Sequence, residues 1–457
     1  MQYNLKVHSL IFRLVCILFA SNLYLRSTIA QSPQLIWSSI SDNPGTSTEF
    51  PQGVAVDRLG NTYMLSTAYT FNPSNPADMQ VVKYNRQGVL QWQISHDGGL
   101  GQFDLASDIV VKNGDIYALG TSVFSPTSNA IAVVKYSSDG TQKWVSNIGL
   151  GSSLLLGGIK LAIADNGNIY VCGRIVVTPT DVDWVIAKVR PTDGALLWMK
   201  QWGGTSQLQE YPTDITVDRD ENVYVSGFDT KGPFVTDAIV LSFDKSGTLR
   251  WTAVQPSASA LKIQILNPAE LLWSGITNNY NLALTKLDLG NGHPIWQKTY
   301  DAPAALSGVH ITVTSDGTRA IVASEEGWPD TDWRVASFKT SNGDLEWSYL
   351  YEGVSIYGLT DLPHGIVSDG NGNVFVLGEV QNPLVIQSYF DVESDIALIK
   401  LDKNGVKIGE AFYNGTATNN DVGTHIVFDS KTQRVLITGW TSNSLDPGSD
   451  IYTAAFK

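Results

Sequence analysis

The stretch IVSDGNGNVFVLG, from Ile366 to Gly378, decides the fold. It joins an apolar run, an Asp, a short turn with Gly and Asn, and a strand that begins with an aromatic segment and ends in Gly. Apolar and polar residues alternate on both sides of the turn, and this period of two predicts a tight β-hairpin. The same phrase recurs as VAVDRLGNTYMLS from Val54, LAIADNGNIYVCG from Leu161 and ITVDRDENVYVSG from Ile215.

A longer repeat surrounds this hairpin. After each copy come a variable loop, a strand such as QVVKY, a second turn with Gly, and a tryptophan. The tryptophans follow one another at roughly 53 residues, and units of this length with about four short strands are typical of propeller blades. In the first unit we expect strands at about 53–57, 61–67, 78–84 and 89–94. The tryptophans on this register are Trp37, Trp92, Trp144, Trp198, Trp251, Trp296 and Trp347, and Ile408 takes the next position.

The two ends of the chain predict how the ring closes. The last unit ends at Lys457 after three strands, whereas the strand at residues 34–37 carries a tryptophan and has no blade before it. Pairing this N-terminal strand with the C-terminal blade would leave no open edge. We therefore expect an all-β fold, a β-propeller of four-stranded antiparallel blades, with eight blades. The unit from Leu261 to Trp296 matches the repeat least well, so seven blades remain the alternative.

Composition limits the classes of protein that fit. Of the 457 residues, 43% are hydrophobic and 16% charged, a balance typical of a folded globular chain. Lys and Arg number 30 against 44 Asp and Glu, for a net charge of -14. This acidity excludes a basic nucleic-acid-binding surface and disfavours contact with anionic membranes. We expect no nucleic-acid partner, no membrane insertion and a monomeric protein.

Residues 1–30 have the parts of a secretory signal peptide. An apolar run extends from Leu14 to Leu25, too short to span a bilayer, and small residues precede Gln31. We expect a signal peptide at residues 1–30 and one propeller domain at residues 31–457, secreted to the extracellular space; a buried strand or an N-terminal anchor is the alternative. The mature chain would keep a single cysteine, Cys172, and one glycosylation sequon at Asn414.

The repeats resemble the secreted propeller-repeat family named for seven blades, over about residues 33–457. They are more distantly similar to the pyrroloquinoline-quinone (PQQ) repeat superfamily, whose blades end in an acidic turn, Gly and Trp. The comparable strings are KVRPTDGALLW, KLDLGNGHPIW and SFKTSNGDLEW, which end at Trp198, Trp296 and Trp347. The resemblance implies architecture rather than chemistry, because the superfamily includes both dehydrogenases and binding scaffolds. No adjacent cysteine pair is present, and we do not expect bound quinone.

Three histidines form the most suggestive pattern for a site. His310, His364 and His425 each lie 14 residues before the small residue of a second strand, which predicts equivalent positions on the innermost strands of three consecutive blades. Imidazoles brought together around one axis could bind a transition metal. The alternative is that they are rim residues bonded to nearby loops, because a slip of one residue turns a side chain to the other face.

Two of the hairpin turns carry oxygen donors on alternate residues, the spacing with which calcium loops begin. The alternative is an ordinary turn in which Asp and Asn bond their own backbone. We therefore expect no obligatory cofactor, with calcium or a transition metal as the open options. The residues are Asp218, Asp220 and Asn222 in one turn, and Asp369, Asn371 and Asn373 in the other.

The long connections should gather on one face of the disc. The loops between second and third strands, and the crossovers between blades, are expected to run about ten residues, and loops on a rigid scaffold commonly bind ligands. Aromatic side chains that we assign to this face include Trp202, Tyr211, Trp328 and Tyr357. No GxSxG, Walker, HExxH or cysteine-cluster motif is present, and no catalytic residue is assigned.

We therefore expect a secreted, non-enzymatic propeller that binds a carbohydrate or protein partner through this face. The alternative is an extracellular enzyme that uses the same face. It would be a polysaccharide hydrolase or lyase, or a metal-dependent oxidoreductase.

Overall fold

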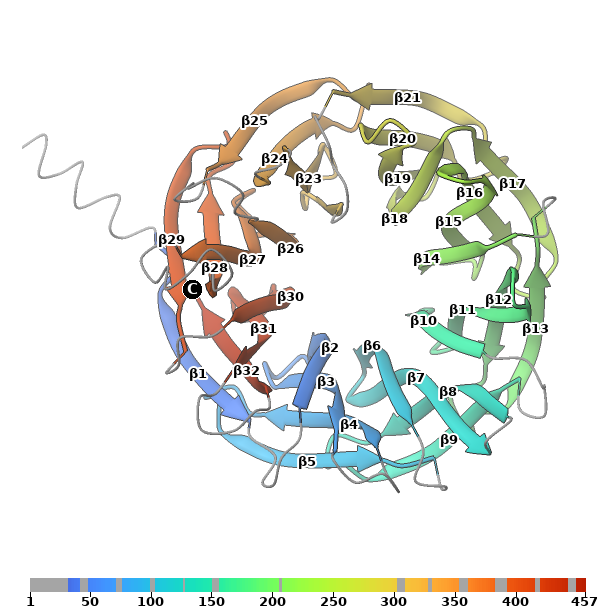
Figure 1. The fold of residues 1–457 in the computed structure, drawn as a ribbon, viewed down its shortest axis with the longest axis horizontal. Helices are drawn as coiled ribbons and strands as arrows, with labels where there is room; N and C mark the ends of the chain where they lie inside the picture. Colours follow the sequence, from blue (N-terminus) through green and yellow to red (C-terminus); the bar gives the residue numbers. More distant parts are fainter. Residues whose placement is uncertain are drawn as a thin grey trace, which may run out of the picture.

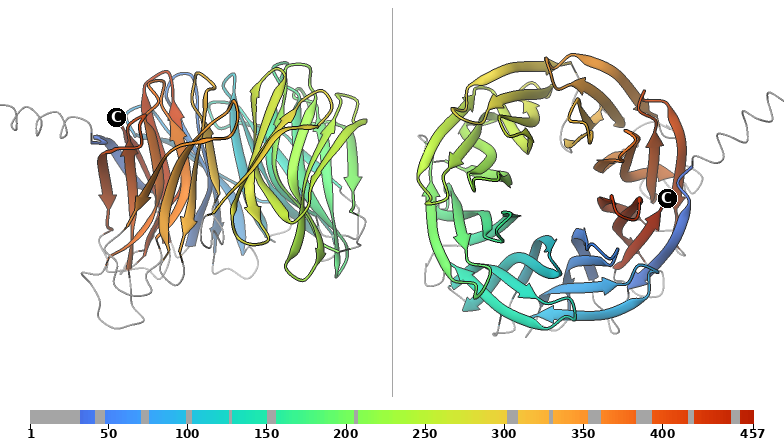
Figure 2. Two further views of the ribbon diagram at one scale, coloured as in Figure 1. Left: turned by 90° about the horizontal axis from the view of Figure 1, so that it is seen from above. Right: turned by 180° about the vertical axis from the view of Figure 1, so that it is seen from behind.

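The computed structural model shows eight four-stranded antiparallel sheets arranged as blades around one axis, in the part of the chain that it describes (Figure 1). The described residues are 32–41, 48–70, 76–98, 103–125, 128–149, 156–204, 208–301, 309–327, 331–352, 361–382, 393–415, 420–442 and 449–457. Viewed from the side, the blades form a disc (Figure 2). Within these ranges no helix could cross a membrane. The predicted all-β propeller is confirmed.

Each blade runs from the axis outward in chain order, and its strands have the following bounds. Blade 1 contains β2 (Thr48–Val56), β3 (Thr62–Tyr69), β4 (Ala77–Tyr84) and β5 (Leu90–His96). Blade 2 contains β6 (Asp104–Lys112), β7 (Asp115–Ser125), β8 (Ser128–Tyr136) and β9 (Gln142–Ile148). Blade 3 contains β10 (Leu156–Ile163), β11 (Ile169–Thr178), β12 (Asp181–Val189) and β13 (Leu196–Trp202). Blade 4 contains β14 (Glu210–Val217), β15 (Val223–Gly232), β16 (Val235–Phe243) and β17 (Leu249–Gln255).

The second half of the ring repeats this order. Blade 5 contains β18 (Ala258–Asn267), β19 (Glu270–Thr277), β20 (Leu282–Asp288) and β21 (Pro294–Tyr300). Blade 6 contains β22 (His310–Val313), β23 (Arg319–Glu326), β24 (Asp332–Lys339) and β25 (Leu345–Tyr351). Blade 7 contains β26 (Leu362–Ser368), β27 (Val374–Asn382), β28 (Glu393–Leu401) and β29 (Lys407–Tyr413). Blade 8 contains β30 (Asp421–Asp429), β31 (Arg434–Ser442), β32 (Ser449–Phe456) and the N-terminal β1 (Leu35–Ser41).

The ring closes as predicted. Strand β1 is the outermost strand of blade 8 and pairs antiparallel with β32, with Trp37 opposite Ala455 and Ile40 opposite Tyr452. Backbone hydrogen bonds of 3.0 Å in both directions join Gln34 to Lys457. In Figure 1 the blue strand therefore lies beside the red C-terminal strands. The weakly matching unit at residues 261–296 forms a complete sheet, so the count is eight blades rather than seven.

The repeated Lys, Gly and Trp fasten each blade to the next. The Trp92 indole N–H and the Lys83 ammonium both donate to the backbone oxygen of Ser138 in blade 2, at 3.2 and 2.5 Å. Gly140 lies against the Trp92 ring at a φ of 87°, where a side chain would be strained. The same indole bond, at 3.1 Å, joins Trp144 to Pro191, Trp198 to Lys245, Trp251 to Leu289, Trp296 to Thr340 and Trp347 to Lys403.

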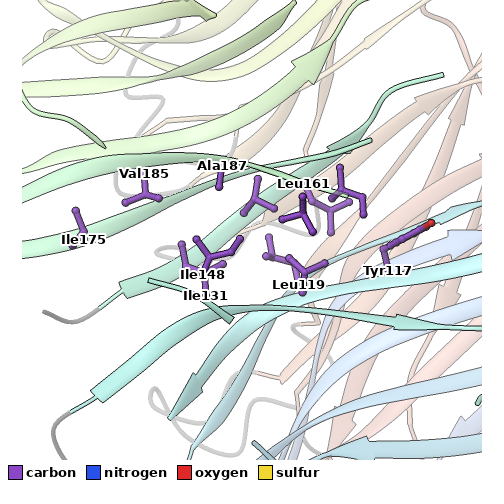
Figure 3. Close-up of a cluster of buried hydrophobic side chains, with 12 residues drawn as sticks. Tyr117, Leu119, Ile131, Ile148, Leu161, Ile175, Val185 and Ala187 are labelled. Atoms are coloured by element: carbon purple, nitrogen blue, oxygen red, sulfur yellow. The ribbon is translucent and has the colours of Figure 1, made fainter. Parts of the chain in front are cut away.

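The hydrophobic core lies between blades. Figure 3 shows one such cluster, in which side chains of blades 2 and 3 pack together. A four-stranded sheet cannot bury both faces alone, so each blade depends on its neighbours for a core. Cys172 is a free, fully buried thiol in another of these interfaces. The labelled residues of the first cluster are Tyr117, Leu119, Ile131, Ile148, Leu161, Ile175, Val185 and Ala187.

The connections on the two faces of the disc differ in length, but less regularly from blade to blade than the sequence predicts. The first-to-second and third-to-fourth turns are short and share one face, while the crossovers and second-to-third connections share the other, which we call the crossover face. The expected length of about ten residues holds for the second-to-third connection of blade 7 and is wrong for most of the others. Two residues connect the strands in blades 2, 3 and 4, and four do so in blade 5, because the flanking strands continue almost to the turn and form long hairpins.

Candidate functional site

A β-bulge in the innermost strand determines which side chains face the axis. In blade 4, Pro212 pairs with Gly227, Thr213 is skipped, and Asp214 pairs with Ser226. A Cβ added at Gly227 would lie 2.1 Å from the backbone oxygen of Tyr211, so the glycine allows the two strands to approach this closely. Similar register shifts occur in the first strands of blades 1, 2, 3, 5, 7 and 8.

The position that follows the bulge in these seven blades, together with His310 of blade 6, forms a ring of eight residues around the axis, and six of them are ionisable. Each pairs with the residue that precedes the small residue of the second strand. We call this set the axial ring. In chain order it holds Gly53, Asp108, Lys160, Asp214, Lys262, His310, Gly365 and His425.

Two of the three histidines, His310 and His425, occupy the equivalent positions that their spacing predicts, and His364 does not. His310 pairs with Ala323 and His425 with Thr438, whereas His364 is the unpaired bulge residue between Pro363 and Gly365. The hairpin of blade 8 is one residue longer than that of blade 7, so a count of 14 residues reaches different positions in the two blades. The three side chains nevertheless line one cavity.

That cavity lies on the axis and has a volume of about 590 Å³. Its polar wall consists of Lys160 and Lys262, the three histidines, Gln52 and Thr424, and the rings of Phe50 and Trp440 contribute the aromatic part. Phe50 and Gln52 lie in the first half of β2, which begins at the crossover face, so the cavity lies toward that face. We call it the axial cavity.

Burial keeps two of the histidines neutral. Desolvation, followed by repulsion from Lys262 and His364, lowers the pKa of His310 to about 3. Desolvation, followed by repulsion from Lys160 and Lys262, lowers the pKa of His425 to about 3. Each ring therefore offers one N–H donor and one lone pair at neutral pH. The Nδ1 atom of His425 lies 3.0 Å from the Thr424 hydroxyl, and the Nε2 atom of His364 lies 3.6 Å from a Glu379 oxygen.

The two acids of the axial ring, Asp108 and Asp214, form hydrogen bonds with groups of the cavity wall. Asp108 accepts a hydrogen bond from the Lys160 ammonium at 3.0 Å and another from the backbone N–H of Leu161, also at 3.0 Å. Asp214 accepts from the backbone N–H groups of Ile215 and Ile263 at 3.0 and 3.1 Å. Attraction to Asp108 raises the pKa of Lys160, which therefore stays protonated. The axial cavity thus presents two ammonium groups and several neutral donors.

The metal hypothesis for the histidines meets a geometric limit. A shared ion requires its ligand atoms to lie within about 5 Å of one another. In the described ranges, the triplets that meet a limit of 4.8 Å are Asp78–Asp97–Asp104 and Asp181–Asp183–Glu210, and the histidine triplet is not among them. A transition metal at His310, His364 and His425 stays a prediction, and it would have to draw these side chains closer together.

The turns with calcium-like spacing have complete local hydrogen bonding. One oxygen of Asp218 accepts from the backbone N–H groups of Asp220 and Asn222, and the other from the Asn222 amide and the Tyr224 hydroxyl, all at 2.8–2.9 Å. Asp369 accepts the corresponding bonds from Asn371 and Asn373 at 2.7–2.9 Å. These are the contacts of a hairpin turn. Calcium at either turn stays a prediction.

Two of the four predicted binding-face aromatics can be placed, and neither lines the axial cavity. Trp202 ends the outer strand β13 and packs on the buried Trp184, with ring centroids 5.0 Å apart. Tyr211 packs on Phe228 at 5.5 Å and lies beside Arg174 near the crossover face. Asn414, the predicted glycosylation site, is exposed and follows β29. The other predicted residues lie outside the described part of the chain: Trp328, Tyr357, Thr416 of the sequon and the leader at 1–30.

These observations define the class of protein, an eight-bladed propeller whose tryptophans fasten successive blades around an axial cavity. The family model described as "Outer membrane protein assembly factor BamB" matches residues 133–367, about half of the chain. The chain belongs to this family of PQQ-like repeats, and the predicted distant relationship to the PQQ superfamily is confirmed. No curated protein matches the sequence.

Solved structures share the fold at low sequence identity. Quinohemoprotein alcohol dehydrogenase from Comamonas testosteroni is 11% identical, with a TM-score of 0.58, over 93% of this chain and 77% of that one. The Dos1 propeller is 12% identical, with a TM-score of 0.57, over 93% and 95% of the two chains. The polysaccharide lyase Uly1 is 9% identical, with a TM-score of 0.51, over 93% and 99%. At these identities the likeness shows architecture alone.

Proposed function

We propose that this protein is an exported, monomeric binding propeller whose axial cavity takes a carboxylate-bearing carbohydrate. The observation that carries the proposal is the charge of the cavity wall. Lys160 and Lys262 line the cavity; of the neighbouring acids, Asp108 pairs with Lys160 and a backbone N–H, and Asp214 accepts from backbone N–H groups. An ammonium next to a cavity of about 590 Å³ favours an anionic group, and a site of this volume suits one or two sugar residues.

The remaining wall suits the neutral parts of a sugar. His310, His425, Gln52 and Thr424 supply donors and acceptors for hydroxyl groups. Phe50 meets Trp440 edge to face, with centroids 6.2 Å apart, and provides an apolar surface for the C–H groups of a ring. The leader-like residues 1–30 and the family description support export.

A binding experiment tests the proposal. Isothermal titration of the purified protein with an oligosaccharide of uronic acids should give saturable binding, and the neutral oligosaccharide of the same length should bind at least about tenfold more weakly. Replacing Lys262 by Ala should weaken acidic-sugar binding by about tenfold or more, because one of two cationic anchors is lost. Lys298→Ala, in the outer strand β21 beside Asp344, is the matched control and should leave affinity unchanged. Equal affinity for the acidic and neutral oligosaccharides would refute the proposal.

A lyase acting on acidic polysaccharide is the second candidate, because imidazole rings and two lysines line the same cavity. A lysine would neutralise the uronate carboxylate, and a neutral imidazole would take the proton from the carbon beside it. The electron pair of that C–H bond would form a C=C bond as the glycosidic oxygen leaves and collects a proton. Release of unsaturated sugar, seen as rising ultraviolet absorbance, would establish the lyase. Binding without product supports the binding propeller.

A further inference from the structure

A group of carboxylates outside the axial cavity lies where blade 3 meets blade 4. Asp181 and Asp183 begin strand β12, and Glu210 is the first residue of β14. One carboxylate oxygen from each residue lies within 4.8 Å of the others. Calcium takes oxygen ligands at about 2.4 Å, so two ligands of one ion can be at most about 4.8 Å apart. The three side chains thus have the separation that a single calcium ion requires.

The crossover between the two blades fixes this arrangement. Residues 203–209 connect β13 to β14, and Gln209 forms a parallel bridge with Val182, between the two aspartates. The backbone N–H of Val182 also donates to Leu208 at 3.0 Å. A Cβ at Gly203 would lie 2.6 Å from a carboxylate oxygen of Asp183, so a side chain there would displace this carboxylate. Glu210 is therefore held beside Asp183 by backbone contacts.

Glu210 is the feature that points to a ligand. Its side chain is fully buried, and neither carboxylate oxygen accepts a hydrogen bond from any residue that the structure describes. Its other neighbours are also acidic. Asp229, whose own partner is Lys231 at 2.5 Å, lies close enough to Glu210 to contribute to the rise in its pKa. A buried carboxylate without a donor is costly, and a cation would satisfy it.

The equivalent residues of two other blades each receive a backbone donor at one carboxylate oxygen. Asp104 begins the first strand of blade 2 and accepts from the backbone N–H of Gly98 at 2.8 Å. Asp421 begins that of blade 8 and accepts from Gly415 at 2.5 Å. In both cases the crossover loop supplies the donor. No described residue of the crossover at 203–209 does so for Glu210.

We propose that Asp181, Asp183 and Glu210 bind a hard divalent cation, calcium, at the junction of blades 3 and 4. The three carboxylates carry more negative charge than the ion neutralises, and Lys231 balances Asp229 nearby. Asp181 and Asp183 are partly exposed, so the ion can keep water as its remaining ligands. Such an ion joins β12 to β14 and thereby fastens blade 3 to blade 4 on the crossover face.

Calcium titration of chelator-treated full-length protein tests the site. Calorimetry should show one equivalent bound, and at about a hundredfold excess over Kd the melting temperature should rise by about 1–3 °C. Glu210→Gln should weaken calcium binding by about a hundredfold, and Asp181→Asn by about tenfold, because each removes a charged ligand. Asp421→Asn is the matched control, at the equivalent position with its own backbone donor, and should bind within about twofold of the parent.

Melting temperatures measured in chelator distinguish a variant that misfolds from one that has only lost the calcium site. There Glu210→Gln should melt no lower than the parent at pH 8, because the variant no longer buries a charge. Absence of calcium binding by the parent protein would overturn the proposal, and so would unchanged affinity in Glu210→Gln or equal loss in Asp421→Asn. The outcome is independent of sugar binding, because none of these residues lines the axial cavity.

Discussion

At the scale of single residues, one backbone oxygen in each of several blades serves as the acceptor for the preceding blade. The oxygen of Lys245 accepts from both the Trp198 indole at 3.1 Å and the Lys188 ammonium at 3.2 Å. The Tyr170 ring lies beneath both groups, 6.0 Å from the Trp198 ring and 5.2 Å from the ammonium. The recurrence of Lys and Trp at a fixed separation follows from this shared acceptor. The Trp198 ring therefore packs on the same turn to which its N–H donates. This turn contains Gly247, whose φ of 82° favours glycine.

Trp37 permits the hydrogen bond to be separated from the packing. Its ring lies on Gly88 as Trp198 lies on Gly247, but no described residue accepts its buried indole N–H. Arg434 donates to the equivalent oxygen of Arg86 instead. Trp198→Phe should therefore lower the free energy of unfolding by about 1–2 kcal/mol, whereas Trp37→Phe should be within about 0.5 kcal/mol of the parent. Chemical denaturation measures both, and equal losses would contradict this role for the indole N–H.

At the scale of elements, the junction of β12 and β14 makes stability depend on pH. Burial, and then repulsion from Asp229 and Asp183, raises the pKa of Glu210 from 4.5 to about 8. An acid whose pKa is higher in the folded state stabilises the fold while protonated, and this stabilisation is lost as pH rises through the folded-state pKa. In chelator, the melting temperature of the parent should therefore fall between about pH 5 and pH 8 relative to Glu210→Gln. Parallel pH profiles of the two proteins would contradict the assignment of Glu210.

The elements also show what the sequence can predict. The Asp–turn–Asn hairpins follow from local chemistry, and Asp57 bonds Leu59, Asn61 and Tyr63 as that chemistry requires. The axial ring could not be found in this way. In seven blades its members are set by a bulge, and Ser66 and Ser324 occupy the place that glycine holds in other blades, so no single residue type marks the register. Counting residues therefore assigned His364 and His425 to equivalent positions, although His364 is the bulge residue of its strand and His425 follows the bulge of its own.

The carboxylate group formed by Asp181, Asp183 and Glu210 also could not be predicted from local sequence patterns. Asp183 belongs to a repeated acidic position, and that repetition favours a structural role at every blade. The repeat does not reveal that Glu210 approaches Asp183 from the next blade and that no described residue donates to it. Only the ring geometry brings the two positions together, because 27 residues of chain separate them.

At the scale of the whole molecule, a single non-local strand closes the ring. Each blade buries its faces against two neighbours, and blade 8 is completed by β1 from the other end of the chain. Trp37 of β1 also packs on the turn of blade 1, so the strand joins both sides of the closure. Loss of β1 would open the edge of β32 and remove one interblade fastening at the same time.

The closure can be tested by removing and then relocating this strand. Deleting residues 32–41 should lower the melting temperature by about 10 °C or more and promote aggregation, because β32 becomes an exposed edge. Moving the same residues behind Lys457 through an Asn-Gly turn should restore the melting temperature to within about 3 °C. The relocated strand would then form with β32 the hairpin that joins the third and fourth strands of the other blades. Recovery in this permutant would show that position in the sheet, rather than position in the chain, gives β1 its effect. A deletion that melts like the parent would show that the ring does not need the strand.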